Sequence, residues 1–126
     1  MTRILIVEGY MDVVALAQFG VDYAVASLGT STTSDHMHLL FRTTSEVVCC
    51  YDGDNAGREA AWRALENALP SLQDGKDLRF VFLPQEHDPD SFIREFGQAV
   101  FEQKLDNAQS YADFLFERLT RDLNLS

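Results

Sequence analysis

Short runs of apolar residues alternate with segments of helical periodicity along most of the chain. Unbroken apolar runs are typical of strands buried on both faces of a parallel sheet, with helices as the crossovers between them. The pattern therefore predicts an α/β fold with a mainly parallel central sheet of about four strands flanked by helices. The predicted strands are Ile4 to Val7, Tyr23 to Ala26, Val47 to Tyr51 and Leu78 to Leu83.

Helical patterns fill the gaps between these strands, and glycine, proline or hydroxyl residues mark their ends. The predicted helices are Met11 to Phe19 with Gly20 as terminator, a second helix capped by Thr33 or Ser34, and Asn55 to Leu69 ending at Pro70 or just beyond. The loop from Ser27 to Ser31 precedes the second helix and carries glycine and hydroxyl groups. Backbone N–H groups in such a loop can receive a phosphate, although loops of this kind are common.

The pattern changes to helices alone after the fourth predicted strand. A helix from Ser91 to Phe96 is predicted, Gly97 breaks it, and apolar residues then recur at helical spacing. Ser110 is the expected cap of the last helix. We therefore expect an α/β domain over residues 1–97 and a C-terminal helical segment over residues 98–126.

Acidic residues stand where the apolar runs stop. Glu8 follows the first run, Asp52 and Asp54 end the third, and Asp88 and Asp90 follow the fourth. Since the carboxyl ends of parallel strands meet at one edge of a sheet, these carboxylates should converge. Their repulsion is costly unless cations offset it or some of them bind protons. The sequence therefore predicts a divalent-metal site, with Mg²⁺ as the expected ion.

Each member of this set also has a structural interpretation. Asp54 can cap the third helix and Asp90 the fourth. Asp12, four residues after Glu8, either reaches the same cleft or interacts with the dipole of its own helix. Arg58 contacts a phosphate or an acid of the site, or it is an ordinary surface arginine.

Two glycines accompany the acids. Gly9 follows Glu8 and Gly53 separates Asp52 from Asp54. Glycine permits tight turns and the close approach of a ligand to the backbone. We therefore assign both glycines to the candidate site.

Composition limits the function. The 126 residues contain 20 acidic and 10 basic side chains, for a formal net charge of -10. This charge opposes binding to nucleic acid or to an anionic membrane, so a polyanion would need basic surface from elsewhere. With 46% hydrophobic residues, the chain is long enough to bury a core without disulfides or structural zinc.

The remaining candidate chemistry is sparse. Cys49 and Cys50 are neighbours on a predicted strand, so they should be buried, reduced thiols on opposite faces. His36 and His38 do not share a helix face, which argues against zinc in this chain. Trp62 and the phenylalanines are expected in the core. The first apolar run is too short for a signal sequence or a membrane span, and we expect a cytoplasmic protein with no membrane association.

Four segments together resemble the Toprim domain of bacterial DNA primases. They are Val7-Glu8-Gly9-Tyr10-Met11-Asp12, Ala26-Ser27-Leu28-Gly29-Thr30, Tyr51-Asp52-Gly53-Asp54-Asn55-Ala56-Gly57-Arg58 and Asp88-Pro89-Asp90. The isolated Glu and Asp-x-Asp are typical of all Toprim proteins, whereas the surrounding residues point to primases. Asn55 replaces the basic residue often found at its position, which weakens one phosphate contact.

The resemblance implies template-directed synthesis of short RNA primers from ribonucleoside triphosphates on single-stranded DNA. It implies that Glu8 and Asp52 bind one Mg²⁺ and that Asp52 and Asp54 bind a second, with Mn²⁺ as a substitute. Asp12, Asp88 and Asp90 match further acids of the cleft. One metal would activate the primer 3′-hydroxyl, and the other would neutralise the triphosphate and pyrophosphate.

The resemblance also implies a fragment of a larger protein. Primases carry a zinc-binding domain, a basic subdomain and a C-terminal domain that binds the replicative helicase, none of which this sequence contains. The final helices resemble the start of the primase helical subdomain. We expect a monomeric fragment that binds metal and primes poorly or not at all.

Two other classes of protein remain open. A phosphoacceptor receiver domain has similar length, acidity and alternation, but it needs a lysine after a late strand, and Lys76 precedes the fourth predicted strand. The other class is a Toprim enzyme that cleaves DNA strands. A topoisomerase of this class would need a nucleophilic tyrosine, usually in a separate domain, and the four tyrosines of this chain lie in core-like or helical contexts.

Overall fold

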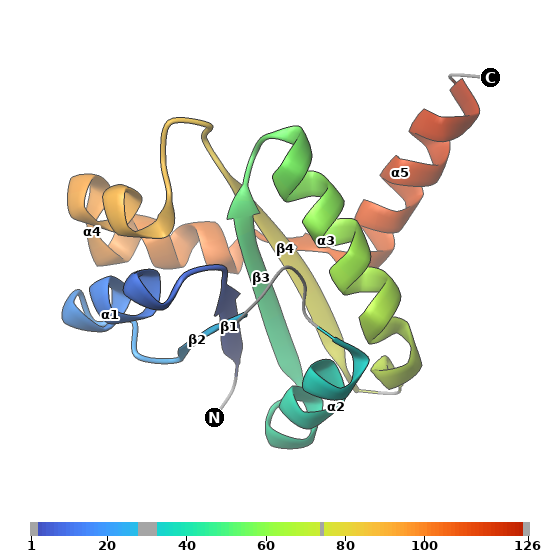
Figure 1. Cartoon of the computed structure of the whole chain (residues 1–126), viewed down its shortest axis with the longest axis horizontal. Coiled ribbons are helices and arrows are strands. Elements are labelled where there is room, and N and C mark those ends of the chain that lie inside the picture. Colours follow the sequence, from blue (N-terminus) through green and yellow to red (C-terminus); the bar gives the residue numbers. More distant parts are fainter. Residues whose placement is uncertain (1–2, 28–32, 74, 125–126) are drawn as a thin grey trace.

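The computed structural model describes residues 3–27, 33–73 and 75–124, which form one α/β body (Figure 1). Within these residues the sheet has five strands in the order β2-β1-β3-β4-β5. The first four strands are parallel, and β5 pairs antiparallel with β4. The strands are β1 (Ile4–Val7), β2 (Ala24–Ala26), β3 (Glu46–Asp52), β4 (Asp77–Leu83) and β5 (Gln109–Ser110).

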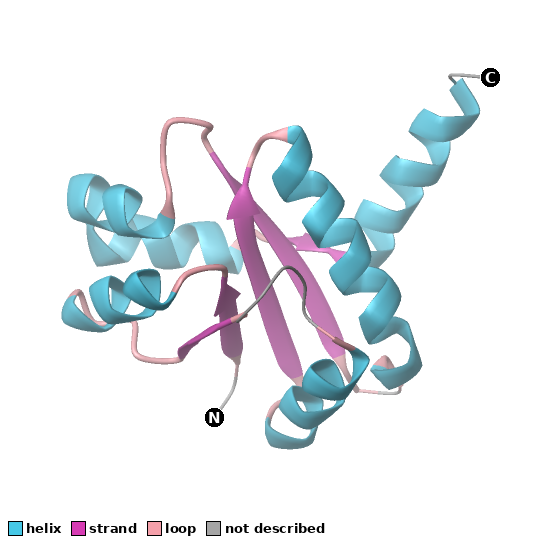
Figure 2. Cartoon of the chain, in the orientation of Figure 1, coloured by secondary structure: helices cyan, strands magenta, loops and turns pink. Residues whose placement is uncertain are grey.

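Helices separate the strands as the sequence predicts (Figure 2). They are α1 (Tyr10–Gln18), α2 (Ser34–Thr43), α3 (Asn55–Ala68) with the 3₁₀ turn η1 (Leu69–Ser71), α4 (Pro89–Asp106) and α5 (Tyr111–Asn124). Thr33 caps α2 by accepting a hydrogen bond from the His36 N–H at 3.1 Å. The predicted fold class is therefore confirmed, with β5 as an unpredicted strand of two residues.

Two groups of helices cover the two faces of the sheet (Figure 1). α2, α3 and α5 lie on one face, and α1 and α4 lie on the other. Neighbouring strand residues point to opposite faces, so Cys49 packs with the first group and Cys50 with the second. Both cysteines are buried and free, as predicted. Burial raises the pKa of the Cys49 thiol to about 12, so this thiol stays protonated at neutral pH.

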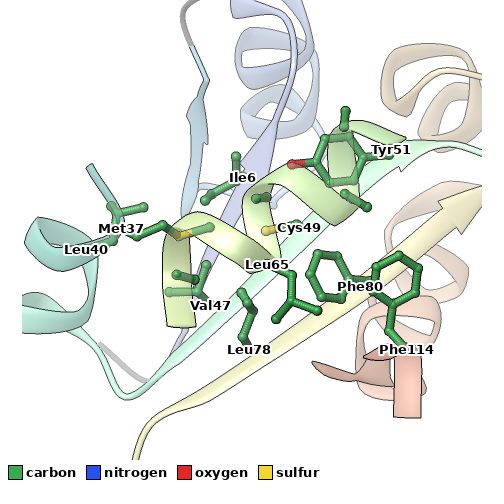
Figure 3. Packing of buried hydrophobic residues seen from close by; sticks show 14 of the residues in the cluster. Ile6, Met37, Leu40, Val47, Cys49, Tyr51, Leu65, Leu78, Phe80 and Phe114 are labelled. Atoms are coloured by element: carbon green, nitrogen blue, oxygen red, sulfur yellow. The ribbon is translucent and has the colours of Figure 1, made fainter. Parts of the chain in front are cut away.

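The core under α3 joins residues that are far apart in the sequence (Figure 3). Met37 from α2, Leu65 from α3 and Phe80 from β4 are almost completely buried there. Phe114 of α5 joins them, with its ring centroid 4.8 Å from that of Phe80. Burial of one such side chain contributes about 1.5–3 kcal/mol. This contact attaches α5 to the sheet.

Helix α4 consists of two helical segments that meet at a kink. Gly97 has φ 88° and ψ 172°, a conformation that glycine tolerates and that interrupts the helical path. The break predicted at Gly97 is therefore confirmed. The second half of the helix continues to Asp106 and buries Phe101 and Leu105 on the α1 side of the sheet.

The start of α4 differs from the prediction. The helix begins at Pro89, a residue favoured at the first helical position, rather than at Ser91. Asp88 is the N-cap, and its Oδ1 accepts a hydrogen bond from the Ser91 N–H at 2.8 Å. The interpretation of Asp90 as this cap is wrong.

The last helix begins as expected. Ser110 Oγ accepts a hydrogen bond from the Asp113 N–H at 3.2 Å. No helix in the described part of the chain combines the length and apolar character that a bilayer crossing requires.

Candidate metal centre

Three neighbouring strands bring the predicted acids to one edge of the sheet. β1, β3 and β4 run parallel, and the turns that leave them lie at the same edge (Figure 1). Asp52 is paired with Leu83, the last residue of β4. Six carboxylates follow these strand ends, and we call them the acidic cluster: Glu8, Asp12, Asp52, Asp54, Asp88 and Asp90.

The carboxylates act on one another electrostatically. Partial burial raises the pKa of Glu8, and the charges of Asp52, Asp54 and Asp12 raise it further. Partial burial likewise raises the pKa of Asp52, together with the charges of Asp54 and Asp88. The cluster therefore disfavours its own ionisation, as expected for carboxylates that share a small volume.

Asp12 belongs to this cluster. Its pKa is raised by burial and then by the charge of Asp88, with smaller contributions from Asp90 and Asp52. A hydrogen bond from the Asp90 N–H to Asp12 Oδ1, with a length of 3.3 Å, acts in the opposite direction. Asp12 also lies in the first turn of α1, so both interpretations of this residue, proximity to the other acids and interaction with the helix dipole, agree with the structure.

Asp54 has a structural task as well. It is the N-cap of α3, and its Oδ1 accepts a hydrogen bond from the Gly57 N–H at 2.7 Å. The capping interpretation is therefore confirmed, while the charge of Asp54 also acts on Glu8 and Asp52. One carboxylate takes part in both arrangements.

Backbone segments approach closely around this capped turn. A Cβ at Gly57 would collide with the carbonyl oxygen of Asp52, and a Cβ at Gly53 would lie 2.6 Å from that of Leu83. A Cβ at Gly9 would lie 3.1 Å from Asp12 Oδ2. Glycine is thus required where β3 turns into α3, and Gly57 is the position that the sequence did not single out.

The two acids of the Asp-Pro-Asp segment have different partners. Asp88 caps α4, whereas Asp90 forms an ion pair with Arg94 one turn further along the helix. The Asp90 N–H reaches across to Asp12. The segment therefore connects α4 to the first turn of α1.

Arg58 points to a neighbouring helix. Its guanidinium lies 4.3 Å from the centroid of the Phe82 ring, and its Nη1 lies 3.8 Å from Glu117 Oε1 of α5. These contacts fit the interpretation as a surface arginine, and they do not test contact with a phosphate. The predicted phosphate loop falls on residues 28–32, which lie outside the described part of the chain; Ser27 before it is buried and donates its N–H to the Val7 carbonyl at 2.8 Å.

Two further residues, Cys50 and His87, were not connected with the acidic cluster from the sequence alone. The Cys50 thiol lies close enough for Asp12, Asp52 and Glu8 to add to the effect of burial and raise its pKa. His87 precedes the cap Asp88 and contacts α4 through both ring nitrogens. The position of His87 directly before a helix cap was the available signal.

The donor chemistry of the acidic cluster fits Mg²⁺ or Mn²⁺, because all six groups offer hard carboxylate oxygens. Within residues 3–27, 33–73 and 75–124, no three His, Cys, Asp or Glu side chains are arranged closely enough to hold one metal ion. Glu8 is mostly exposed, so its side chain can rotate toward a cation, whereas Asp54, whose Oδ1 caps α3, offers its second carboxylate oxygen. The site fits a metal in chemistry and requires side-chain movement to complete the ligand set.

The position of Lys76 argues against the receiver-domain interpretation, which needs a lysine after a late strand. The strand order is also that of flavodoxin-like folds, so it does not exclude this class. However, Lys76 lies before β4, and its Nζ donates a hydrogen bond to the Phe41 carbonyl at 2.6 Å. This holds Lys76 at the amino end of β4, opposite the acidic cluster, where it cannot act as the receiver lysine.

Comparisons with known proteins match this chain to the Toprim-like family and to DNA primases. The family model described as Toprim-like matches residues 5–93. The DNA primase of Haemophilus influenzae is 61% identical over 124 residues, which are 98% of this chain and 21% of that protein.

Solved structures agree with this match. The catalytic core of Escherichia coli primase superposes with a TM-score of 0.94 at 60% identity, over 97% of this chain and 39% of that chain. A DnaG primase catalytic domain bound to single-stranded DNA also has a TM-score of 0.94, at 59% identity, over 97% of this chain and 38% of that chain. The chain thus spans about one fifth of the length of the curated relatives that it matches.

Proposed function

Because this chain belongs to the Toprim-like family, we propose that it forms the metal-dependent nucleotidyl-transfer site of a DNA primase. The reaction is synthesis of short RNA primers for replication by a DNA-directed RNA polymerase. The observation that carries the proposal is the convergence of six carboxylates from three strand ends. The close match to primase catalytic cores supports it.

Glu8 and Asp52 would hold one Mg²⁺, and Asp52 and Asp54 would hold a second, with Mn²⁺ as a substitute. Such ions would supply Lewis-acid activation of the primer 3′-hydroxyl and neutralise charge on the triphosphate. The shared role of Asp52 follows from the resemblance to primases, and the charges support it, because, in addition to burial, Asp52 raises the pKa of Glu8 and Asp54 raises that of Asp52. The repulsion among these acids favours cation binding, since a cation removes it.

The remaining residues of the site position these ligands. Asp12 accepts a hydrogen bond from the Asp90 backbone and holds the start of α4 against α1. Asp88 and Asp90 add negative charge to the cleft, which would strengthen the retention of cations. Gly9 and Gly53 would be the glycines of the cofactor site, where they also make room for Asp12 and for the Leu83 carbonyl oxygen. Arg58 is a candidate phosphate contact.

The substrates follow from the proposed reaction. They are a single-stranded DNA template, the growing RNA primer and ribonucleoside triphosphates, and the solved primase domain bound to single-stranded DNA supports the first. The net charge of -10 requires that other parts of a primase supply the basic template surface. Those parts would also bind the replicative helicase within a cytoplasmic primosome. Residues 98–126 would begin the helical subdomain, and this chain alone would be monomeric and at most weakly active.

Manganese binding tests the site directly. Titration calorimetry of the unchanged chain should show Mn²⁺ binding that Asp52→Ala abolishes or weakens strongly. Asp22→Ala is the matched control, because Asp22 is an exposed acid that lies before β2, away from the cluster. Equal Mn²⁺ binding by Asp52→Ala and the unchanged chain would refute the assignment.

Primer synthesis tests the reaction. Within a full-length primase, this segment should support RNA primer formation on single-stranded DNA, and Asp52→Ala should abolish it. The 126-residue chain alone should give little or no product. Vigorous synthesis by this chain alone would contradict the proposal that other parts of a primase must bind the template. Metal-dependent nicking of DNA would favour the strand-cleaving Toprim class.

A further inference from the structure

His87 makes an unusual set of contacts with the first two turns of α4. Its Nδ1 lies 3.0 Å from Ser91 Oγ, and its Nε2 lies 3.2 Å from Glu95 Oε2. Its ring meets that of Phe92 edge to face, with 5.6 Å between centroids and an interplanar angle of 85°. The side chain is only 12% exposed. A loop residue is thus held on one face of the helix that follows it.

These contacts combine two known devices for starting a helix. His87 directly precedes the N-cap and packs on the fourth helical residue, Phe92, which is the arrangement of a hydrophobic staple. Asp88 and Ser91 form a reciprocal capping box, in which Ser91 Oγ accepts the Asp88 N–H at 3.1 Å. His87 contacts the Ser91 hydroxyl, which belongs to this capping box. The imidazole therefore supports both the hydrophobic staple and the capping box.

Both ring nitrogens of His87 face polar groups of α4. A carboxylate only accepts, so a proton on the nitrogen that faces Glu95 favours this 3.2 Å contact. The Ser91 hydroxyl that faces Nδ1 also donates to the Asp88 carbonyl at 3.3 Å, so it joins the ring to the backbone of the cap. The ring is therefore held by contacts with two residues of the helix.

The orientation of this helix start matters for the acidic cluster. A staple sets the direction in which the chain enters its helix. The residues that immediately follow His87 include Asp88, whose charge acts on Asp12 and Asp52, and Asp90, whose N–H bonds to Asp12. A change of direction at His87 would move both carboxylates relative to the strand ends.

We propose that His87 is a positioning residue that holds Asp88 and Asp90 at the acidic cluster. The proposal rests on the proposed function, because it gives these two carboxylates their task in cation binding and primer synthesis. His87 itself does not contact the reacting groups. It acts through the capping box, by contact with Ser91, and through the packed ring of Phe92.

Two substitutions separate the parts of this arrangement. His87→Ala removes the ring, whereas His87→Phe keeps an aromatic ring against Phe92 and removes both nitrogen contacts. We expect the Mn²⁺ dissociation constant to rise about tenfold in His87→Ala, the scale seen for residues that orient metal ligands, and by a smaller factor in His87→Phe. Leu40→Ala is the control for simple loss of stability, since Leu40 is buried on the opposite face of the sheet. This variant should unfold at a lower temperature and bind Mn²⁺ unchanged.

A double-mutant cycle decides whether His87 acts through the two carboxylates. In a background with Asp88→Asn and Asp90→Asn, asparagine keeps the cap but removes both charges. His87→Ala should then weaken Mn²⁺ binding no further, because the groups that it positions are gone. An equal loss in both backgrounds, or no loss in either, would overturn the proposal.

Two further measurements separate this proposal from the proposed function. Amide hydrogen exchange at Asp90 needs no cation, and it should become faster in His87→Ala but not in Leu40→Ala. In a full-length primase, His87→Ala should lower the kcat of primer synthesis about tenfold and leave KM for the triphosphates unchanged. Absence of primer synthesis in the unchanged protein would refute the proposed function, whereas an unchanged exchange rate at Asp90 would refute the role of His87.

Discussion

The backbone N–H of Asp90 donates a hydrogen bond to Asp12 Oδ1, with 3.3 Å between nitrogen and oxygen. This bond joins the first turn of α4 to the first turn of α1, which lie on the same face of the sheet. It also partly offsets the repulsion that Asp12 experiences from neighbouring acids. The carboxylates of the acidic cluster repel one another, and the backbone N–H of Asp90 therefore helps to hold Asp12 near them.

This bond can be separated from the charge of Asp12. Asp12→Asn keeps an oxygen acceptor and removes the charge, whereas Asp12→Ala removes both. The asparagine variant should be more stable than the alanine variant by about 0.5–1 kcal/mol, the lower part of the range for one hydrogen bond. Urea unfolding in metal-free buffer measures the difference. The same two substitutions at exposed Asp22 should differ by less, and equal stability of the Asp12 pair would show that the bond contributes nothing.

Stability should depend on pH in a direction set by the raised pKa values of Glu8, Asp12 and Asp52. Above the ordinary carboxyl pKa of about 4, the folded state keeps protons that the unfolded state has released. The contribution of these groups to stability is therefore greatest at low pH and is lost as pH rises through their folded pKa values. At pH 7, Asp52→Asn should gain at most about 1 kcal/mol over the unchanged chain, because partly exposed carboxylates are screened by water.

Comparing the pH dependence of stability in Asp52→Asn with that in the unchanged chain separates the contribution of the acidic cluster from that of other titrating groups. Urea unfolding from pH 4 to pH 7 in metal-free buffer should show a smaller loss of stability in Asp52→Asn than in the unchanged chain. Parallel stability curves would mean that Asp52 does not experience the predicted repulsion.

Divalent cations should reverse this pH dependence. Mn²⁺ or Mg²⁺ should bind the ionised carboxylates and stabilise the folded chain by mass action, by about 2.7 kcal/mol at one hundred times the dissociation constant. The stabilisation should be largest near pH 7 and fade as pH falls toward 4, because protons compete for the same oxygens. Thermal unfolding with and without MnCl₂ at each pH measures it. A cation effect equally large in Asp52→Ala would locate the binding elsewhere.

The sequence was sufficient for the part of the fold that depends on local pattern. β3 and β4 are largely buried on both faces, and the apolar runs Val47 to Tyr51 and Phe80 to Leu83 made them recognisable. The rule that parallel strands end at one edge then brought Glu8 and Asp52 together without coordinates. β5 escaped prediction because a strand of two residues is too short to have a period.

Features that depend on distant packing were not predictable in this way. The direction of Arg58 is set by Glu117, which lies on the last helix, and no local pattern joins the two. The cap of α4 was available but misread, since proline favours the first helical position and so marks Asp88 as the cap. The contacts of His87 depend on the rotamer of a loop residue, for which the sequence has no periodic signal.

The turn from β3 into α3 should tolerate no side chain at Gly57. A Cβ there would meet the Asp52 carbonyl oxygen, and backbone cannot move aside as a flexible side chain can. Gly57→Ala should cost about 3 kcal/mol or more, the upper range for overpacking. Gly75→Ala is the control: Gly75 has φ 82° but open space around its Cβ position, so its cost should be about 1–2 kcal/mol. Urea unfolding compares them, and an equal cost at both glycines would show that the β3 to α3 turn can relax.

Substitution can separate the observed task of Asp54 as a helix cap from its proposed task as a metal ligand. As the N-cap of α3 it needs only one oxygen acceptor, which serine also offers, whereas metal binding needs a carboxylate. Asp54→Ser should therefore keep the stability of the metal-free chain and lose much of its Mn²⁺ affinity. Asp54→Ala should lose the affinity and also about 1 kcal/mol of stability, the usual cost of a missing cap. Urea unfolding and Mn²⁺ calorimetry on the same samples give both quantities. If Asp54→Ser bound Mn²⁺ as tightly as the unchanged chain, Asp54 would be a cap alone, and the second predicted ion would lack its ligand.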